Sequence, residues 1–344
     1  MCVNKVHYGG IIVKAWIRLG MSGLTAAAVL LAGCSAAGSS GATDYPVKQI
    51  TYVVPFSPGG GVDLVARAVA EYASKEWNQP IVVENKPGGG GAVGAQAVLQ
   101  QSANDGYTIL AINNSSTSML SAGLMNPPVD IEDHRFVAKI VEDAPAFAVS
   151  ATAPWNNFKE FSDWAKTNPG ELTWTSVGPS GFSAFAVAEW MEAIGADMSK
   201  TQMVATKGAS ESAPLVAGGH AVLAVHTVAE LYPLAAAGKI KILAVQSDKR
   251  SPYFPDVPTT AEQGVEGLSI KWWTGLSVPA GTPDAVTKKW EDLLAKMTQD
   301  PAFVDKLKGM QLEAAYQNSE SFADTVNKET GYYTELAEKR GMRK

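Results

Sequence analysis

The stretch VVPFSPGGGVDLVARAVA, residues 53–70, joins an apolar run to three consecutive glycines and then to an amphipathic segment. β-Branched and aromatic residues between Tyr45 and Phe56 are typical of a strand, and Pro55 ends its ladder. From Val62 onward, apolar residues recur at helical spacing. The stretch therefore predicts a strand, a glycine turn and a helix, the repeating unit of an α/β fold.

This turn, which contains Gly59 and Gly60, is a candidate anion site. The first N–H groups of a helix have no intrahelical partner, and the helix dipole adds partial positive charge at the same end. Glycine lets a ligand approach the backbone and permits unusual φ angles. We expect Asp63 to cap free amides more than to contact a ligand. The alternative is that the glycines only form a tight turn.

Strands alternate with helices along the rest of the chain, which predicts a parallel, doubly wound sheet. The alternation continues beyond Ala144 to residue 247, and we predict a second sheet there. Residues 271–283 predict one more strand, and residues 284–300 and 319–340 predict two final helices. A length of 344 residues is compatible with two lobes.

A second glycine run contains G-x-G-x-x-G at Gly89, Gly91 and Gly94. This pattern is typical of dinucleotide sites. Here Lys86 and Pro87 separate the strand from the glycines, and no acidic residue ends the next strand. We therefore expect no nucleotide, and no other cofactor.

A third turn, within residues 175–190 (TSVGPSGFSAFAVAEW), repeats the order of strand, glycine and serine turn, and helix. If the first and third turns come from different lobes, they face one cleft and hold one ligand from both sides. The alternative is a polar, capped turn. The hydroxyl groups and glycines of this turn are Ser176, Gly178, Ser180, Gly181 and Ser183.

Catalytic and metal-binding patterns are scarce. After Cys34 the histidines are His134, His220 and His226, and the sequence contains no H-E-x-x-H, cysteine pair or G-x-S-x-G. We expect no metal site and no enzymatic activity.

Two other features could contribute to a ligand site. Lys207, before Gly208, either offers a positive charge to an anion or is solvated. We expect Trp272 and Trp273 to pack between the domains. The alternative is that they form a wall of the ligand pocket.

The N-terminal region predicts export and lipid attachment. In residues 1–33, Lys14 and Arg18 precede an apolar run too short to span a bilayer. The following LLAGCS resembles the lipobox of bacterial lipoproteins, in which the cysteine, here Cys34, is acylated. Cleavage there would leave Cys34 without a disulfide partner, because the only other cysteine is Cys2. Residues 34–44 predict a flexible tether.

The charge balance argues against nucleic acid as a partner. Without residues 1–33 the chain keeps 25 basic and 34 acidic residues, a net charge of about −9. An anionic ligand must therefore be held by local dipoles.

Several segments together resemble one family, in order and over nearly the whole chain after the signal. They are YPVKQITYVVPFSPGGGVDLVAR, QPIVVENKPGGGGAVGA, DGYTIL, SDKRSPYFPDVPTTAEQGV and GLSVPAGTP. They are similar to the extracytoplasmic receptors of tripartite tricarboxylate transporters, the Bug receptors. This resemblance implies a two-lobed periplasmic-binding-protein fold, each lobe a β-sheet flanked by helices, with crossing strands between the lobes.

The resemblance also implies lobe boundaries and a ligand. Lobe I would be residues 45–147 plus 275–344 and lobe II residues 148–274, with hinges near Phe147 and Leu276. The ligand would be a small organic acid bound largely by backbone amides and waters.

The family pattern P-F-x-x-G-G-x-x-D places ligand contacts on Phe56, Ser57, Gly59, Gly60 and Asp63. Contacts from the second lobe would lie in residues 176–183, including Phe182. Three positions depart from relatives: no histidine follows Gly181-Phe182-Ser183, Thr206 precedes Lys207-Gly208 where a tyrosine is common, and His226-Thr227 replace Asp-Asn. Fewer polar groups and more phenylalanines suggest a less charged or more apolar acid.

These observations predict a monomeric, lipid-anchored receptor that closes on a carboxylate and delivers it to a membrane permease. Two alternatives stay open. One is an envelope hydrolase with Ser180 or Ser183 as nucleophile, which needs a base within hydrogen-bond reach. The other is a sensor subunit with the same ligand contacts and a signalling partner.

Overall fold

The computed structural model describes residues 44–343. The predicted signal segment 1–33, Cys34 and the predicted tether up to residue 43 lie outside the described residues. Among the residues described, no helix has the length and apolar character that a membrane span requires.

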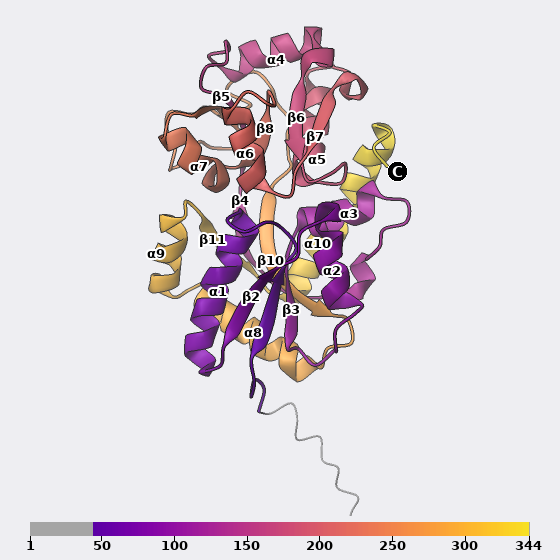
Figure 1. The fold of residues 1–344 in the computed structure, drawn as a ribbon, viewed down its shortest axis with the longest axis vertical. Helices are drawn as coiled ribbons and strands as arrows, with labels where there is room; N and C mark the ends of the chain where they lie inside the picture. The colour runs from indigo at the N-terminus through magenta and orange to yellow at the C-terminus, as the bar shows by residue number, and fades with distance from the viewer. Residues whose placement is uncertain (1–43, 344) are drawn as a thin grey trace, which may run out of the picture. The chain divides into compact units, whose positions relative to one another are not determined.

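The larger sheet has six strands in the order β11-β4-β10-β3-β1-β2 (Figure 1). β1 pairs parallel with β2 and β3, whereas β10 pairs antiparallel with β3 and β4, and β11 antiparallel with β4. The strands are β1 (Ile50–Val54), β2 (Ile81–Asn85), β3 (Thr108–Asn113), β4 (His134–Asp143), β10 (Trp272–Pro279) and β11 (Glu313–Gln317).

The parallel pairing predicted for the first three strands is confirmed, but the sheet to which they belong is mixed. β10 returns from the second half of the chain and enters between β3 and β4 in the opposite direction. A strand that returns from a distant segment leaves no mark of its direction in local periodicity. The sequence pattern also predicts neither β4 nor β11.

Helices cover this sheet because each has one buried apolar face. In α1 the residues that recur at helical spacing, such as Val62, Val65 and Val69, are buried against the sheet. The helices are α1 (Gly61–Trp77), α2 (Ala92–Leu99), α3 (Ser118–Gly123), α8 (Asp284–Met297), α9 (Pro301–Gly309) and α10 (Ser319–Lys339). We call these helices and the six-stranded sheet lobe I.

The second group of strands forms two small sheets. One is antiparallel in the order β8-β5-β9, the other is the parallel pair β6-β7, and an isolated bridge between Trp174 and Leu223 links them. The strands are β5 (Pro145–Ser150), β6 (Thr173–Ser176), β7 (Gln202–Ala205), β8 (Ala224–Thr227) and β9 (Ile240–Val245). The single second sheet that we predict is divided because β8 is short and meets β6 at one bridge only.

Four helices pack on these small sheets, in the upper part of Figure 1. They are α4 (Phe158–Thr167), α5 (Phe182–Ala193), α6 (Ala209–Ala217) and α7 (Val228–Ala236). Their core is aromatic: the Trp190 ring stacks on Phe161 and contacts Phe147 and Phe158. We call these helices and β5–β9 lobe II.

The chain passes from lobe I to lobe II at Ala144, between β4 and β5, and returns just before Trp272. Phe147 and Leu276, near which we predict the hinges, lie inside β5 and β10. The C-terminal helix α10 forms a further connection, because Tyr333 packs on Phe185 of α5. Figure 1 shows the end of α10, in yellow, beside lobe II.

The Glu189 carboxylate of α5 joins these connections. It accepts hydrogen bonds from the Ser269 amide at 2.9 Å and from the Tyr332 hydroxyl at 2.7 Å. It also accepts from the Gln246 side chain at 2.8 Å and from the Ile270 amide at 3.3 Å. Glu189 thereby links α5 of lobe II to α10 and to residues 246–271, the segment through which the chain returns to lobe I.

Candidate functional site

A small cavity of about 40 Å³ lies between the lobes and is lined by residues of both. Lobe I contributes Phe56, Ser57, Gly60, Gly61, Val62, Asn113, Ser115 and Trp272. Lobe II contributes Val177, Phe182, Ser183, Gly208, Ala209, His226 and Glu230. We call this cavity the interlobe cleft.

The first glycine turn places the N-terminus of α1 at the cleft. Gly59 has a φ of +83°, which favours glycine, and Gly60 is the N-cap residue. The Gly61 amide donates to Glu230 Oε1 of lobe II at 2.8 Å. Within residues 44–343, the amides of Gly60 and Val62 have no hydrogen-bond partner. The turn therefore presents free donors and already binds one carboxylate oxygen.

Asp63 stabilises this turn from behind. Its carboxylate accepts from the Gly59 amide at 2.9 Å, from Arg67 and from Asn85. Burial alone would raise the pKa of Asp63, but the hydrogen bonds from Arg67, Gly59 and Asn85 hold it below its usual value. Asp63 thus caps the turn and does not line the cleft.

The serine turn of lobe II contacts lobe I directly. The Phe182 amide donates to Ser115 Oγ at 2.8 Å. Ser180 packs so closely on α3 that a Cβ on Gly123 would lie 2.9 Å from its own Cβ. Residues of both turns line the same cavity, so the turns lie on opposite sides of it, which is the arrangement needed to hold one ligand from both sides.

The Ser183 hydroxyl donates to the Val225 carbonyl oxygen at 2.6 Å. A carbonyl oxygen cannot act as a general base, so this geometry gives the hydroxyl no activation as a nucleophile. The hydrolase alternative gains no support from Ser183.

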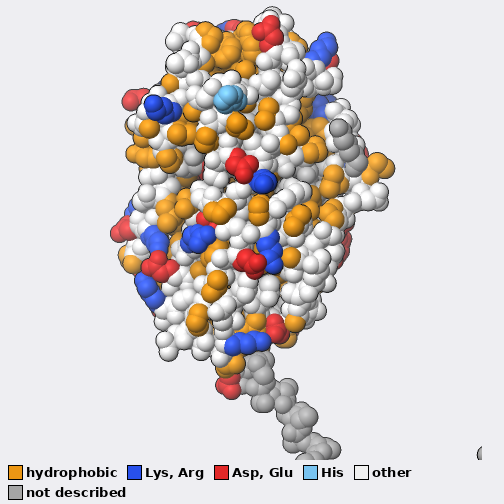
Figure 2. Space-filling view, viewed as in Figure 1, with side chains coloured by type: hydrophobic (Ala, Val, Ile, Leu, Met, Phe, Trp, Pro, Cys, Tyr) orange, Lys and Arg blue, Asp and Glu red, His pale blue; other side chains and the backbone are white. Residues whose placement is uncertain are grey.

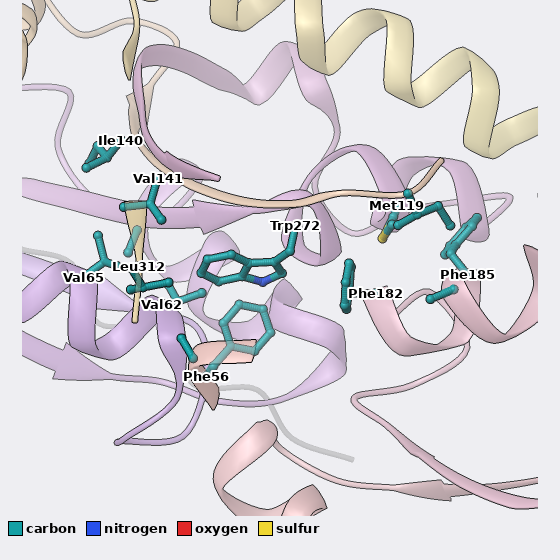
Figure 3. Packing of buried hydrophobic residues seen from close by; sticks show 14 of the residues in the cluster. Phe56, Val62, Val65, Met119, Ile140, Val141, Phe182, Phe185, Trp272 and Leu312 are labelled. Atoms are coloured by element: carbon teal, nitrogen blue, oxygen red, sulfur yellow. The ribbon is translucent and has the colours of Figure 1, made fainter. Parts of the chain in front are cut away.

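Aromatic and aliphatic side chains form the wall of the cleft. Figure 3 shows the Trp272 indole above the Phe56 ring, with Val62 and Phe182 close by. Trp273, the next residue of β10, points to the other face of the sheet, where it packs on Phe322 and donates to Glu329. Trp272 thus packs in the hydrophobic core, as we expect from the sequence, and also lines the cleft.

Two polar side chains of lobe II complete the cleft. His226 is 6% exposed, its Nδ1 lies 3.5 Å from Glu230 Oε2, and its buried Nε2 has no partner among the described residues. Burial alone would raise the pKa of Glu230, but the hydrogen bond and charge of His226 and the amide donors Gly61 and Thr227 hold it below its usual value. Glu230 is therefore a largely buried carboxylate, with a side chain 10% exposed, whose surroundings favour its ionised form.

The predicted site residues divide into two groups. Those that line the cleft are Phe56, Ser57, Gly60, Phe182, Ser183, Gly208 and His226. Those placed outside its lining are Gly59, Asp63, Ser176, Gly178, Ser180, Gly181, Lys207 and Thr227. Lys207 is exposed and reaches lobe I through its backbone, because its carbonyl accepts from the Ser57 amide at 3.2 Å.

Sequence reasoning missed Glu230, Asn113 and Ser115 of the cleft lining. Asn113 ends β3 and Ser115 follows it, so both lie at the carboxyl end of a strand, where α/β sheets commonly bind ligands. Their position at the end of a predicted strand is a feature from which both residues could have been predicted. Glu230 has the helix-capping position of an ordinary surface acid, and no local pattern distinguishes it.

The second glycine run serves close packing. A Cβ on Gly94 would lie 2.8 Å from Pro55, and one on Gly91 would lie 2.7 Å from Ser116. These glycines let α2 approach β1 and the segment after β3.

A larger cavity of about 580 Å³ lies beside the crossing segments, with Asp143, Gln246 and Lys271 in its lining. Lys271 is paired with Glu142, and Arg250 with Glu262. Neither of the two turns lines this cavity, so the interlobe cleft remains the candidate site.

Comparison with known proteins agrees with this architecture. A protein of Cupriavidus necator named "UPF0065 protein in gbd 5'region" is 31% identical over 328 residues, which cover 94% of this chain and 97% of that protein. The structure of the periplasmic binding protein BugD matches with a TM-score of 0.80 and 28% identity, over 87% of this chain and all of BugD. A periplasmic transporter structure matches with a TM-score of 0.81 and 30% identity, over 87% of this chain and 99% of the other.

The family model described as "Tripartite tricarboxylate transporter family receptor" matches residues 65–342. This family consists of solute receptors, not enzymes. The two-lobed fold that the resemblance implies is confirmed by the periplasmic binding proteins it matches. The chain belongs to the tripartite tricarboxylate transporter receptor family.

Proposed function

We propose that this receptor binds the carboxylate of a small organic acid in the interlobe cleft and passes the acid to the membrane subunits of a tripartite transporter. One observation carries the proposal: the N-terminal turn of α1 binds a carboxylate oxygen, that of Glu230, at 2.8 Å, and the neighbouring amides of Gly60 and Val62 are free among the described residues. Amides at a helix N-terminus are suited to carboxylate ligands.

Closure of the lobes would be stabilised by hydrogen bonds that form only when the two lobes come together. The amides of Ser57, Gly61 and Phe182 each donate across the cleft in this conformation. The cleft volume of about 40 Å³ means that the lobes must separate to admit an organic acid. An acid that binds the closed state more tightly than the open state shifts the equilibrium toward closure.

A thermal-shift screen tests the proposed ligand class. Acids with one, two or three carboxylates, aromatic acids and amino acids are added to the protein lacking residues 1–33. A ligand at 100 times its Kd stabilises the native state by about 2.7 kcal/mol. We expect at least one carboxylate to raise Tm and its uncharged amide analogue to leave Tm unchanged. No shift with any acid would contradict the proposal.

Gly61→Ala is expected to weaken binding of the best acid about tenfold, or ~1.4 kcal/mol. The new Cβ would lie 3.1 Å from the Trp272 ring and 3.2 Å from Glu230 Oε1, so the lobes could not close fully. Gly170→Ala is the control, because its Cβ would meet no atom within 4 Å and Gly170 does not line the cleft. Titration calorimetry compares the two. An equal loss of affinity in the control would argue that the new Cβ at Gly61 does not act by hindering closure of the lobes.

We further propose that the receptor is monomeric and held at the outer face of a membrane by a lipid on Cys34. The support is the lipobox-like sequence at residues 31–34. In cells expressing the full chain, Cys34→Ser should move the receptor from the membrane fraction to the soluble fraction. A variant that stays with the membrane would contradict lipid attachment at this residue.

A further inference from the structure

The carboxylate of Glu230 is fixed inside the cleft by both lobes. Glu230 forms a capping box with Thr227: Oε2 accepts from the Thr227 amide at 3.3 Å, and Thr227 Oγ1 accepts from the Glu230 amide at 3.2 Å. Oε1 accepts from Gly61 of lobe I. The capping box lies within lobe II, so it holds the carboxylate at the cleft also when the lobes separate, and a ligand in the cleft must lie beside it.

The cleft has no basic side chain to balance a ligand with two charges. Among the described residues, the fifteen that line it include no lysine or arginine. Arg67, in α1 after the first glycine turn, is engaged with Asp63. Lys207 is exposed at the rim. The groups left to bind an anion in the cleft are therefore the amides at the α1 N-terminus and the His226 ring.

These two sources are sufficient for one ligand carboxylate. The free amides of Gly60 and Val62 can donate hydrogen bonds to it, and His226 Nε2 is unpartnered within the described part of the chain. A second carboxylate on the same molecule would meet the apolar wall of Phe56, Phe182 and Trp272 or the charge of Glu230. Either contact opposes binding, because like charges repel strongly where water is excluded and an unpaired charge is costly to bury.

We propose that the cleft selects acids with one carboxylate and an uncharged, apolar remainder, and that Glu230 excludes acids with a second carboxylate. This inference rests on the proposed carboxylate function and names the class of acid. Glu230 is then a specificity-determining residue of the receptor.

Matched acids of equal length test the proposal: hexanoate against adipate, and benzoate against terephthalate. Titration calorimetry at pH 7.5 and constant ionic strength should give wild-type affinities at least about tenfold higher for the monocarboxylates. Glu230→Gln keeps the size of the side chain and removes its charge. This variant should bind adipate and terephthalate more tightly than the wild type does. The ratio of monocarboxylate affinity to dicarboxylate affinity should therefore fall about tenfold.

Glu211→Gln is the control, because Glu211 is an exposed acid near the rim of the cleft, 3.4 Å from Ser57 Oγ. Its charge is screened by solvent, so the ratio of monocarboxylate affinity to dicarboxylate affinity should stay as in the wild type. If this affinity ratio falls equally in Glu230→Gln and Glu211→Gln, Glu230 does not determine the specificity. A wild type that binds adipate as tightly as hexanoate would overturn the selectivity, even if Glu230→Gln fails to fold.

The outcomes also separate this inference from the proposed function. Binding of both acids without preference contradicts the selectivity only and leaves the carboxylate function intact. If no acid of the set, malate and citrate included, binds the wild type, the carboxylate function fails and the selectivity falls with it.

Discussion

Glu189→Ala is expected to lower the free energy of unfolding by about 2–4 kcal/mol. Its carboxylate is 5% exposed and accepts from Gln246, Ser269, Ile270 and Tyr332. Alanine would remove this acceptor from the buried Gln246 side chain and the buried Ile270 amide, which costs more than the loss of an average hydrogen bond, whereas Ser269 and Tyr332 are exposed and can bind water. Chemical denaturation at neutral pH measures the effect.

Glu192→Ala is the matched control, one helical turn away in the same helix. Glu192 pairs with Lys339 and Arg340 near the surface, and such exposed pairs contribute up to about 1 kcal/mol. We expect the two variants to differ several-fold in their loss of stability. Similar small losses would show that Glu189 does not hold lobe II to the returning segment.

The second large effect is expected at Trp272. Trp272→Ala should destabilise the protein by about 3–5 kcal/mol, because the ring is 2% exposed, and should also weaken binding of the best carboxylate about 10-fold or more. The wall that Trp272 forms with Phe56 and Phe182 would be opened to water (Figure 3). Denaturation and calorimetry below the melting range separate the two effects.

Trp273→Ala provides the comparison, because Trp273 is the next residue of β10 and is equally buried on the other face of the sheet. It should lose a similar amount of stability and keep the wild-type affinity. If both variants lose affinity in proportion to stability, Trp272 is a packing residue and not part of the ligand wall.

Local periodicity is sufficient for most helices and strands of this protein, and for specific reasons. The apolar face of α1 and the glycine turn before it lie within one short stretch, so their pairing can be predicted. The position of β10 between β3 and β4 depends on a contact between Thr274 and Asn113, more than 150 residues apart. Such long-range pairing leaves no local pattern, and the mixed direction of the sheet follows from it.

The same distinction applies to the cleft. Phe56, Ser57 and Gly60 belong to a turn whose chemistry is visible in sequence. Glu230 enters the cleft because closure of the lobes brings α7 onto the first amide of α1, at Gly61. Trp272 faces the cleft and not the opposite side because of the register of β10. Both depend on tertiary geometry.

The surface in view (Figure 2) carries charges of both signs. Figure 2 shows basic and acidic side chains interspersed over one face, and many form ion pairs, such as Lys296 with Glu76 and Lys306 with Glu71. A nucleic-acid surface instead gathers basic residues on one face. Attraction of an anionic ligand therefore depends on the dipoles inside the cleft.

Amide chemical shifts of ¹⁵N-labelled protein, followed during titration with the acid that gives the largest thermal shift, test the central claim most directly. We predict that the largest changes occur at Gly60, Gly61, Val62 and Phe182, the amides of the two facing turns. Changes centred instead on the cavity near Asp143 and Gln246, with the two turns unaffected, would contradict the claim that these backbone amides bind the ligand.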